Sequence, residues 1–216
     1  MYNIGIVNIN IAGVNIVSKT KKRATYHHGD LRRELIEAAV DMLSESGVAG
    51  LSLRKLALQV GVSHNAPYMH FSSRDALLAA IAQYGFQKLR ASLAPDGEDW
   101  HERFVAGCQT YVEFGTTHPE LFQVMFMEHD PEAFPEMVQD SLAALQVLTD
   151  VIAEGQLLGK IREGDAHEFA TLIWSLLHGL SVLFANRNKA PLPYRSDDAA
   201  DLTETFLDQV LTGLGV

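Results

Sequence analysis

The sequence predicts an all-α protein in which an N-terminal three-helix bundle, containing a helix-turn-helix, precedes a larger helical domain. From Leu31 onward, apolar residues recur at the spacing of three and four that marks amphipathic helices. Capping serines and aspartates open these segments, and glycines or prolines close them. No alternation of polar and apolar residues follows Gly97, so the second domain is expected to be helical throughout.

The first 27 residues are predicted to form a flexible extension that ends in a basic arm. Residues 1–17 repeat isoleucine and asparagine, and they lack both the basic start and the cleavage site of a secretory signal. Their β-branched residues leave a short strand open as an alternative. Such an arm either follows a DNA groove or remains a solvated tail. The basic residues of the arm are Lys19, Lys21, Lys22 and Arg23.

The first long helix is predicted over residues 31–46. Asp30 precedes it as an N-cap whose negative charge suits the helix dipole. Gly47 ends the helix, because glycine adopts the left-handed C-cap conformation without steric cost. The apolar stripe of this helix consists of Leu31, Leu35, Ala38 and Met42.

A helix, a tight turn and a second helix are predicted in residues 52–71. Ser52 caps the first helix and Gly61 ends it. Ser63 follows only two residues after the glycine, so it is expected to cap a second helix that starts at a steep angle to the first. This layout is typical of a helix-turn-helix, whose second helix enters the major groove of DNA. The apolar stripe of the first helix consists of Leu53, Leu56, Ala57 and Val60.

The second helix of this motif carries polar side chains that can hydrogen-bond base edges or phosphates. Pro67 stands at the fourth helical position, where it lacks an amide hydrogen and crowds the preceding turn. We therefore expect this helix to begin as a tighter turn. By pattern alone, the alternative is a short helical hairpin without a role in DNA binding. The polar residues are His64, Asn65, Tyr68 and His70.

Six further helices are predicted in the second domain. Ser72 and Asp75 form a capping box at the start of the first of them. That helix starts against the bundle and ends in the second domain, so it is expected to link the two mechanically. The predicted ranges are 73–94, 100–116, 121–128, 137–158, 166–187 and 198–214.

Composition limits the class of protein. The chain has 216 residues, of which 47% are hydrophobic, as expected for a globular protein with a sizeable core. Its single cysteine, Cys108, suits a reducing cytosol and is expected to be a buried thiol. No run of eighteen apolar residues occurs, so we expect a cytoplasmic protein without a membrane partner.

Two short clusters of metal-ligating residues were weighed as metal sites. His27 and His28 have no third and fourth ligand at metal-site spacing nearby. Glu128-His129-Asp130 is interpreted as a solvated helix end rather than a metal cluster. We therefore expect no metal and no cofactor.

Charge is distributed unevenly along the chain, whose formal net charge is −10. Residues 1–75 hold nine Lys or Arg and six Asp or Glu, a net charge of +3. Residues 76–216 hold eight and twenty-one, a net charge of −13. Attraction for phosphate is therefore expected at the N-terminal end, and the acidic remainder discourages contact with DNA elsewhere.

From His28 to about Leu78, the chain resembles the DNA-binding domain of the TetR family of bacterial transcriptional regulators. Pro67 departs from the leucine or isoleucine that is more frequent there. In the second domain, Trp174, His178 and Gly179 resemble the tryptophan-histidine-glycine signature of one C-terminal domain class in this family. The N-terminal resemblance is carried by the helix 31–46, Gly47, Leu51–Arg54, Leu56–Ala57, Gly61–Ser63, Tyr68, His70–Phe71 and Arg74–Leu78.

This resemblance implies a DNA-binding domain at residues 28–75 and an effector-binding and dimerisation domain at residues 76–216. It implies a repressor that binds double-stranded operator DNA as a homodimer and is released by a small-molecule effector, with no catalytic residues. The expected DNA contacts are Lys22, Arg23, Ser52, Arg54, Ser63, His64, Asn65, Tyr68 and His70. The expected pocket residues are Phe104, Cys108, Tyr111, Phe122, Met125, Phe126, Trp174 and His178. The expected dimer interface contains Leu177, Val182, Leu202, Phe206, Leu207 and Val210.

Three alternatives remain beside this interpretation. The aromatic and methionine residues of the second domain can form an ordinary core instead of a cavity wall. A helical enzyme would need an acid–base pair such as His178 with a carboxylate, but the sequence has no nucleophile elbow, phosphate loop or paired zinc-ligand motif. An interaction module that does not bind DNA would leave the basic N-terminal third unexplained.

Overall fold

The computed structural model describes residues 10–11, 14–15, 31–93, 97–186 and 198–214. The chain divides into two compact units, Met1–Leu31 and Arg32–Val216. In the first unit, β1 (Asn10–Ile11) pairs antiparallel with β2 (Val14–Asn15). The short strand that the sequence left open for residues 1–17 is therefore present at these four residues. The basic arm with Lys22 and Arg23, the paired histidines and the Asp30 cap lie outside the described residues.

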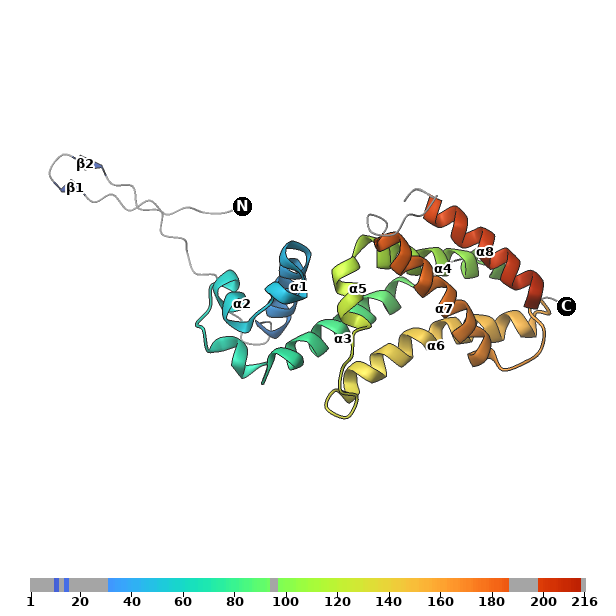
Figure 1. The fold of residues 1–216 in the computed structure, drawn as a ribbon, viewed down its shortest axis with the longest axis horizontal. Helices are drawn as coiled ribbons and strands as arrows, with labels where there is room; N and C mark the ends of the chain where they lie inside the picture. The colour runs from blue at the N-terminus through green and yellow to red at the C-terminus, as the bar shows by residue number, and fades with distance from the viewer. Residues whose placement is uncertain (1–9, 12–13, 16–30, 94–96, 187–197, 215–216) are drawn as a thin grey trace. The chain divides into compact units, whose positions relative to one another are not determined.

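The N-terminal bundle consists of α1 (Leu31–Gly50), α2 (Leu53–Val60) and the short 3-10 helix η1 (Ala66–Met69) (Figure 1). The regular part of α1 ends where predicted, because Gly47 adopts φ of +64° inside the assigned range. The core of the bundle is apolar and almost fully buried. Its largest members are Leu35, Leu43, Leu56 and Phe71, each no more than 2% exposed.

Both predicted ends of α2 are confirmed. The Ser52 hydroxyl accepts a hydrogen bond from the amide of Lys55 over 3.2 Å, which satisfies one free donor of the first turn. Gly61 adopts the left-handed conformation with φ of +77°, and its amide donates to the carbonyl of Ala57 over 3.0 Å. These two caps define where the chain turns toward η1.

The second helix of the motif is shorter and starts later than predicted. The expectation that the Ser63 side chain caps it is wrong: η1 has Asn65 at its N-cap, and the Ala66 amide donates to the Ser63 carbonyl over 2.9 Å. In an α-helix capped by Ser63, residue 67 would have to donate to that carbonyl, and Pro67 has no amide hydrogen. The tighter turn expected from Pro67 is confirmed.

Six α-helices follow within the described residues from Arg74 onward, and all six were predicted. Ser73 caps the first by accepting from the Ala76 amide over 3.0 Å, so the assignment of this cap to Ser72 is wrong by one residue. The helices are α3 (Arg74–Ser92), α4 (Trp100–Thr117), α5 (Pro119–Met125), α6 (Pro135–Leu157), α7 (Ala166–Ala185) and α8 (Ala199–Leu214).

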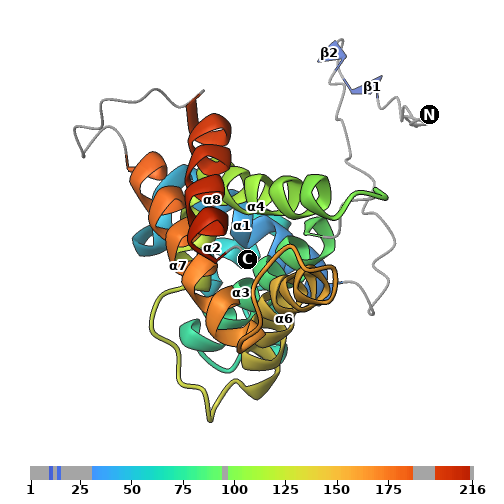
Figure 2. The same cartoon turned by 90° about the vertical axis from the view of Figure 1, so that its right-hand side faces the viewer.

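The long helix α3 packs mainly against α6 and α5. The side-chain amides of Gln83 and Gln87 both donate to one carboxylate oxygen of Asp140 on α6, over 2.9 and 2.8 Å. Helix α4 packs against α7 and α8. In the end-on view, α7 and α8 lie together on one side of the bundle and α6 lies on another (Figure 2). Because α3 starts beside the helix-turn-helix, its packing connects that motif to the larger domain.

Within the described residues, α7 is the one helix long and apolar enough to cross a membrane, with a mean hydropathy of 1.5. It packs against α4, α6 and α8 in the second domain. A central helix of a bundle meets the same criteria of length and composition as a membrane span. The buried residues of α7 are Phe169, Ala170, Ile173, Leu177, Leu180, Ser181 and Phe184.

Candidate functional site

The turn between Gly61 and Phe71 presents a row of exposed polar side chains. Buried Pro67 holds this turn against the bundle, and the residues around it point outward. Met69 is 83% exposed beside Tyr68, which is 53% exposed. Met69 is not among the predicted contacts because it has no strong hydrogen-bonding group, yet apolar atoms can contact a thymine methyl. The exposed polar residues are Ser63, His64, Asn65 and Tyr68.

The other predicted DNA contacts differ in their availability. Arg54 is exposed, whereas His70 is half-buried beside the ring of Phe71. The Ser52 hydroxyl is half-buried and already serves as the cap of α2. Arg74 has a structural role, because its guanidinium donates to the carbonyls of Val48 and Leu51 over 2.6 and 3.2 Å.

The helix-turn-helix is electrically neutral as a whole. Residues 31–75 contain five Lys or Arg and five Asp or Glu, so the +3 of the N-terminal third comes from residues 1–30. The net positive charge of the N-terminal third therefore lies in residues 1–30, which hold Lys19, Lys21, Lys22 and Arg23.

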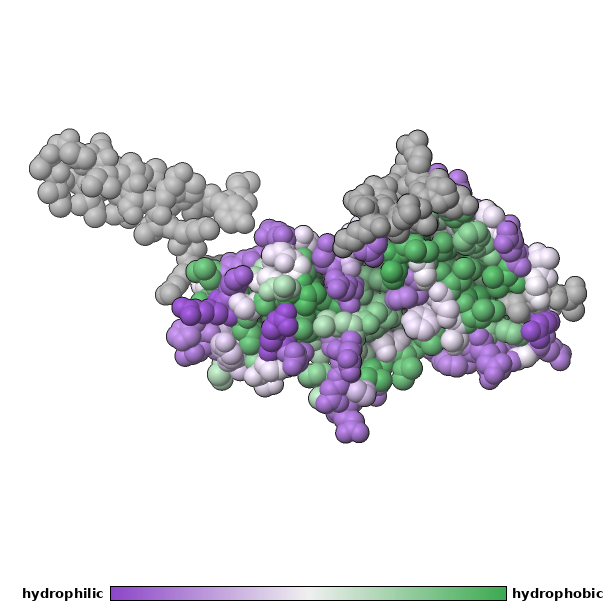
Figure 3. All heavy atoms as spheres, in the orientation of Figure 1, coloured by the Kyte–Doolittle hydropathy of each residue, from purple (hydrophilic) through white to green (hydrophobic). Residues whose placement is uncertain are grey.

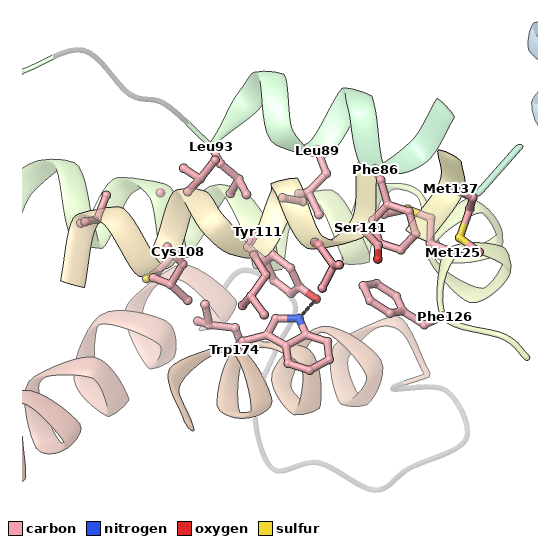
Figure 4. Close-up of a pocket in the computed structure, with 18 of the residues that line it drawn as sticks. Phe86, Leu89, Leu93, Cys108, Tyr111, Met125, Phe126, Met137, Ser141 and Trp174 are labelled. Atoms are coloured by element: carbon pink, nitrogen blue, oxygen red, sulfur yellow. Dashed lines mark hydrogen bonds between the residues drawn. The ribbon is translucent and has the colours of Figure 1, made fainter. Parts of the chain in front are cut away.

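A cavity of about 480 Å³ lies in the larger domain among α3, α4, α5, α6 and α7 (Figure 4). Six of the eight predicted pocket residues line it: Phe104, Cys108, Tyr111, Met125, Phe126 and Trp174. Phe122 and His178 are not among its lining residues. Their rings stack on each other, with centroids 5.1 Å apart.

Helix α6 contributes a whole side of the cavity that sequence reasoning missed. Its aliphatic residues carry no chemical mark that separates a cavity wall from ordinary core, and only the three-dimensional packing distinguishes the two. Helix α3 adds Phe86, Leu89 and Leu93. The contribution of α6 is Met137, Ser141, Leu142, Ala144, Leu145, Val147, Leu148 and Val151.

A hydrogen-bonded trio explains why Trp174 and His178 stand four residues apart on α7. The Trp174 indole N–H donates to the Tyr111 hydroxyl over 2.8 Å, as Figure 4 shows, and that hydroxyl lies 3.2 Å from His178 Nδ1. Since the hydroxyl already accepts from Trp174, it can donate its own hydrogen to a neutral His178. Burial lowers the pKa of His178, which favours this neutral form.

Other titratable groups near the cavity are also held uncharged or paired. Burial raises the pKa of the Tyr111 phenol, opposed by the bond from Trp174, and burial also raises the pKa of the Cys108 thiol. A thiol that remains protonated is a poor nucleophile. The Arg103 guanidinium lies 2.5 Å from Glu154 Oε1.

The segment Glu128-His129-Asp130 lies in irregular backbone between α5 and α6, and two of its side chains make local hydrogen bonds. The ring nitrogen Nε2 of His129 lies 2.7 Å from the carbonyl oxygen of Val124. The Asp130 carboxylate accepts from the amides of Glu132 and Ala133. These bonds engage the His129 and Asp130 side chains within the segment itself.

A second hollow lies between the helix-turn-helix and the start of α6. It is lined by Arg32, residues 68–72, the first turns of α3 and residues 133–137. Met137 lines both this hollow and the larger cavity. One side chain therefore borders both spaces.

One face of α7 and α8 is apolar and open to solvent. On α7, Leu172, Val182 and Leu183 are 51%, 40% and 44% exposed, and a side chain added at Gly179 would meet nothing within 4 Å. On α8, the half-buried residues are Leu202, Phe206 and Val210. Figure 3 shows hydrophobic residues gathered over the region where α7 and α8 lie in Figure 1.

Two of the six predicted interface residues do not belong to this face. Leu177 is 2% exposed and lines the cavity, and Leu207 is fully buried. Both point into the chain's own core, so the prediction that they contact a partner is corrected. The apolar spacing identifies these residues as helical and hydrophobic, but it does not show which side of each helix packs inward.

Comparison with known proteins assigns both parts of the chain. Residues 35–81 match the family model for bacterial regulatory proteins of the tetR family. Residues 104–209 match the model for the tetracyclin repressor-like C-terminal domain. A solved structure of a protein with unknown function from Rhodococcus sp. RHA1 is 35% identical, covers 90% of this chain and all of that chain, and superimposes with a TM-score of 0.78.

Named relatives agree with these models. The class A tetracycline repressor from transposon 1721 of Escherichia coli is 40% identical over 73 residues, which span 34% of this chain and 34% of that protein. The HTH-type transcriptional regulator YobS of Bacillus subtilis is 26% identical over 73% of this chain and 80% of that protein. FadR from Bacillus subtilis, solved in complex with stearoyl-CoA, shares the fold with a TM-score of 0.68 at 18% identity, over 84% of this chain and 98% of that chain. The chain therefore belongs to the TetR family of bacterial regulatory proteins, which are DNA-binding transcriptional regulators with a helix-turn-helix.

Proposed function

We propose that this protein is a homodimeric repressor that leaves its operator when a small apolar effector fills the cavity of the larger domain. The observation that carries the proposal is the path of α3, which starts beside the helix-turn-helix and then lines the cavity with Phe86, Leu89 and Leu93. A ligand that displaces this helix acts on the DNA-binding motif directly. We place the protein in the cytoplasm, with its operator.

We propose that the exposed turn 63–69 enters the major groove. In this arrangement, His64 and Asn65 face base edges, while Tyr68 and His70 contact phosphates. The exposure of these side chains supports this role. His70 is half-buried, so only the exposed edge of its ring can contact a phosphate. The exposed residues are Ser63, His64, Asn65 and Tyr68.

Two variants separate base reading from backbone contact in gel-shift titrations on the upstream DNA of the protein's own gene. Tyr68→Phe removes one hydroxyl, so it should weaken binding to all sequences alike. Asn65→Ala should relax preference at one base pair, by about 1–3 kcal/mol for a bidentate contact. Wild-type binding by both variants would show that the turn does not read DNA.

The basic arm has its own test. Replacing Lys19, Lys21, Lys22 and Arg23 by alanine should reduce the slope of log affinity against log salt by up to about four, roughly one for each lost phosphate contact. Base preference should be unchanged, because the arm does not read the major groove. An unchanged slope would assign the arm to the solvated tail.

We propose that the apolar face of α7 and α8 is the dimer interface. A single short recognition turn reads too few bases for useful specificity, and a two-fold interface uses the same patch on both chains. Val182, Leu202, Phe206 and Val210 are retained from the prediction, and exposed Leu172 and Leu183 extend the patch. We also propose the tryptophan-histidine-glycine class for this domain, supported by the bonds that Trp174 and His178 make to Tyr111.

Two substitutions that each introduce one carboxylate test the interface. Phe206→Glu places a carboxylate on the apolar face and should give monomers that have lost operator affinity, as measured by light scattering and gel shift. Leu157→Glu is the control, because Leu157 is 89% exposed and stands on α6, a helix that contributes no residue to this face. A monomeric wild-type protein at micromolar concentration would remove the dimer from the proposal.

The switch requires that the effector prefer a spacing of the two recognition turns that does not fit the operator. Half-sites lie roughly 34–36 Å apart, one turn of DNA. Helix α3 is tied to α6 through Asp140, and Met137 of α6 borders both the cavity and the hollow beside the helix-turn-helix. These contacts support a coupled movement of α3 and α6. The FadR complex with stearoyl-CoA is consistent with a ligand that carries an apolar chain.

Reciprocity provides the test of the switch. If the effector weakens operator binding by a coupling of about 1–3 kcal/mol, operator DNA must weaken effector binding by the same factor. The measurement is titration of a bound small molecule, found by screening the purified protein, with and without operator. Equal affinity in both titrations would leave DNA binding in place and remove the switch.

A further inference from the structure

We propose that Gly179 is the point at which α7 of one protomer crosses α7 of a second copy of this chain, beside the two-fold axis of the dimer. This inference rests on the dimer proposed above, and it names the contact at the centre of that interface. It also gives a role to the glycine of the tryptophan-histidine-glycine signature, because the hydrogen bonds within the chain account for Trp174 and His178 alone.

The packing within this chain does not explain a glycine at position 179. Gly179 lies in the middle of α7, where glycine is the least favourable residue after proline. Two other helical glycines are explained by close packing: a Cβ atom at Gly85 would lie 2.5 Å from Met125 Sδ, and one at Gly115 would lie 2.7 Å from Ser181 Cβ. At Gly179, a Cβ atom would meet nothing within 4 Å. A close approach from outside the chain would account for this residue.

Gly179 stands at the centre of the exposed face of α7. Residues three, four and seven positions apart share one face of a helix. Leu172 and Ser175 precede Gly179 by seven and four positions, and both are exposed. Val182 and Leu183 follow it by three and four positions, and both are exposed. A second helix can therefore come closest at the glycine while larger apolar side chains pack on either side of it.

The polar side chains of this face already have partners in their own helix. The Ser175 hydroxyl donates to the Thr171 carbonyl over 2.7 Å. The Asn186 side-chain amide donates to the Val182 carbonyl over 2.9 Å. Because these donors are satisfied, covering the face with another helix removes little hydrogen bonding to water.

The distribution of charge favours a second copy as the occupant. Residues 76–216 have a net charge of −13, so two copies repel each other wherever their acidic surfaces meet. Helix α7 has no Asp, Glu, Lys or Arg between Phe169 and Ala185, and only 39% of its most apolar stretch is buried within the chain. A basic partner would bind the acidic surfaces instead. A second copy of this acidic domain can approach without repulsion over the uncharged face.

A two-fold contact gives the crossing a measurable geometry, because a residue beside the axis lies opposite its own copy. Packed helices have axes about 8–10 Å apart, and each Cα atom lies roughly 2.3 Å from its axis. Facing Cα atoms at a crossing are therefore about 3–6 Å apart. A disulfide spans Cα atoms about 4.4–6.8 Å apart, so Gly179→Cys should form one across the axis.

The test is oxidative cross-linking of the full chain. Mild oxidation of Gly179→Cys should convert most of the protein into a disulfide-linked dimer on a non-reducing gel. The wild type should not cross-link, because its single cysteine, Cys108, is 3% exposed. The controls are Leu172→Cys, about 10 Å along α7 from the crossing, and Leu157→Cys on α6. Both should cross-link at least about tenfold more slowly, because their Cα atoms do not face their own copies at disulfide distance.

A second variant adds volume at the crossing without a new cysteine. Gly179→Leu meets no atom of its own chain near the added Cβ, and leucine favours a helix more than glycine does, so the helix content by circular dichroism should be unchanged or higher. The same side chain holds the two copies of α7 apart. The dissociation constant of the dimer should therefore rise at least about tenfold in analytical ultracentrifugation. An unchanged dissociation constant would overturn the crossing at Gly179.

The outcomes separate this inference from the proposed dimer. If Gly179→Cys does not cross-link while the wild type is a dimer that Phe206→Glu dissociates, the interface of α7 and α8 stands and the crossing point is wrong. Cross-linking of Leu157→Cys as fast as that of Gly179→Cys would indicate random collision and would also overturn the crossing. A wild type that is monomeric at micromolar concentration would remove both the proposed dimer and this inference.

Discussion

The helix-turn-helix and the larger helical domain solve different packing problems within one chain. In the first, Leu35, Leu43, Leu56 and Phe71 close a small core completely, and polar groups point outward from the turn. In the second, five helices surround a cavity of about 480 Å³. The first region presents polar side chains on the surface of a closely packed bundle. The second region surrounds a cavity with apolar side chains. Matched substitutions in the two regions should therefore differ in their cost.

Removal of side-chain volume should give the largest difference. Leu56 is fully buried in the N-terminal bundle, so Leu56→Ala should lower the free energy of unfolding by about 2–5 kcal/mol. Leu145 is half-buried and borders the cavity, so Leu145→Ala removes fewer contacts and should cost roughly 1 kcal/mol. Urea unfolding followed by circular dichroism measures both. Equal losses would mean that the cavity wall is packed as tightly as the bundle.

Addition of volume tests the same comparison from the other side. Ala57 is 1% exposed in α2, so Ala57→Leu should destabilise the bundle by about 1–3 kcal/mol. Ala144 lines the cavity, so Ala144→Leu has room for its extra atoms and should change the free energy of unfolding by less than about 1 kcal/mol. The same variant should lose binding of the fluorescent apolar probe N-phenyl-1-naphthylamine, because the leucine fills part of the cavity. A large destabilisation at Ala144 would contradict the open space assigned to this wall.

The larger domain is also closely packed in places, and Gly155 lies in one of them. A Cβ atom at this position would lie 2.4 Å from Trp100 Cζ2. The indole of Trp100 cannot easily withdraw, because its N–H donates to the Val151 carbonyl over 2.8 Å and its ring stacks on Phe104. Gly155→Ala should therefore cost roughly 1–2 kcal/mol in thermal or urea unfolding. A neutral result would show that Trp100 is more mobile than its contacts indicate.

The smallest expected effect concerns pH and the hydrogen-bonded trio of Tyr111, Trp174 and His178. Burial lowers the pKa of His178 in the folded protein, so the unfolded chain binds more protons once pH falls through about 6.5. The contribution of His178 to stability is therefore complete above that pH and declines below it. His178→Gln should flatten the fall in melting temperature between neutral and mildly acidic pH. An identical pH profile in both proteins would show that the protonation of His178 does not contribute.

Much of the helix-turn-helix could be predicted because its signals are local. Ser52, Gly47 and Gly61 each act on backbone within a few residues, so their conformations follow from short-range rules of capping. The wrong cap at Ser63 also has a local cause. Serine favours an N-cap, but Pro67 lacks the amide hydrogen that an α-helix starting at Ser63 would need. The existence and order of the six later helices also followed from periodicity together with local capping and helix-breaking residues.

The functional surfaces of the larger domain depended on tertiary structure. Periodicity shows that one side of a helix is apolar, but Leu207 and Phe206 are equally apolar neighbours on α8, and only packing buries the first and leaves the second partly exposed. Likewise, no local feature identifies α6 as a cavity wall. The sequence by itself determined the family through its motifs, and it determined the helices and the caps at Gly47, Ser52 and Gly61 because these arise from contacts within a few residues along the chain. Tertiary structure alone decided which apolar side chains meet, which face solvent and which border empty space, because those outcomes depend on contacts between residues as far apart as Phe86 and Leu177.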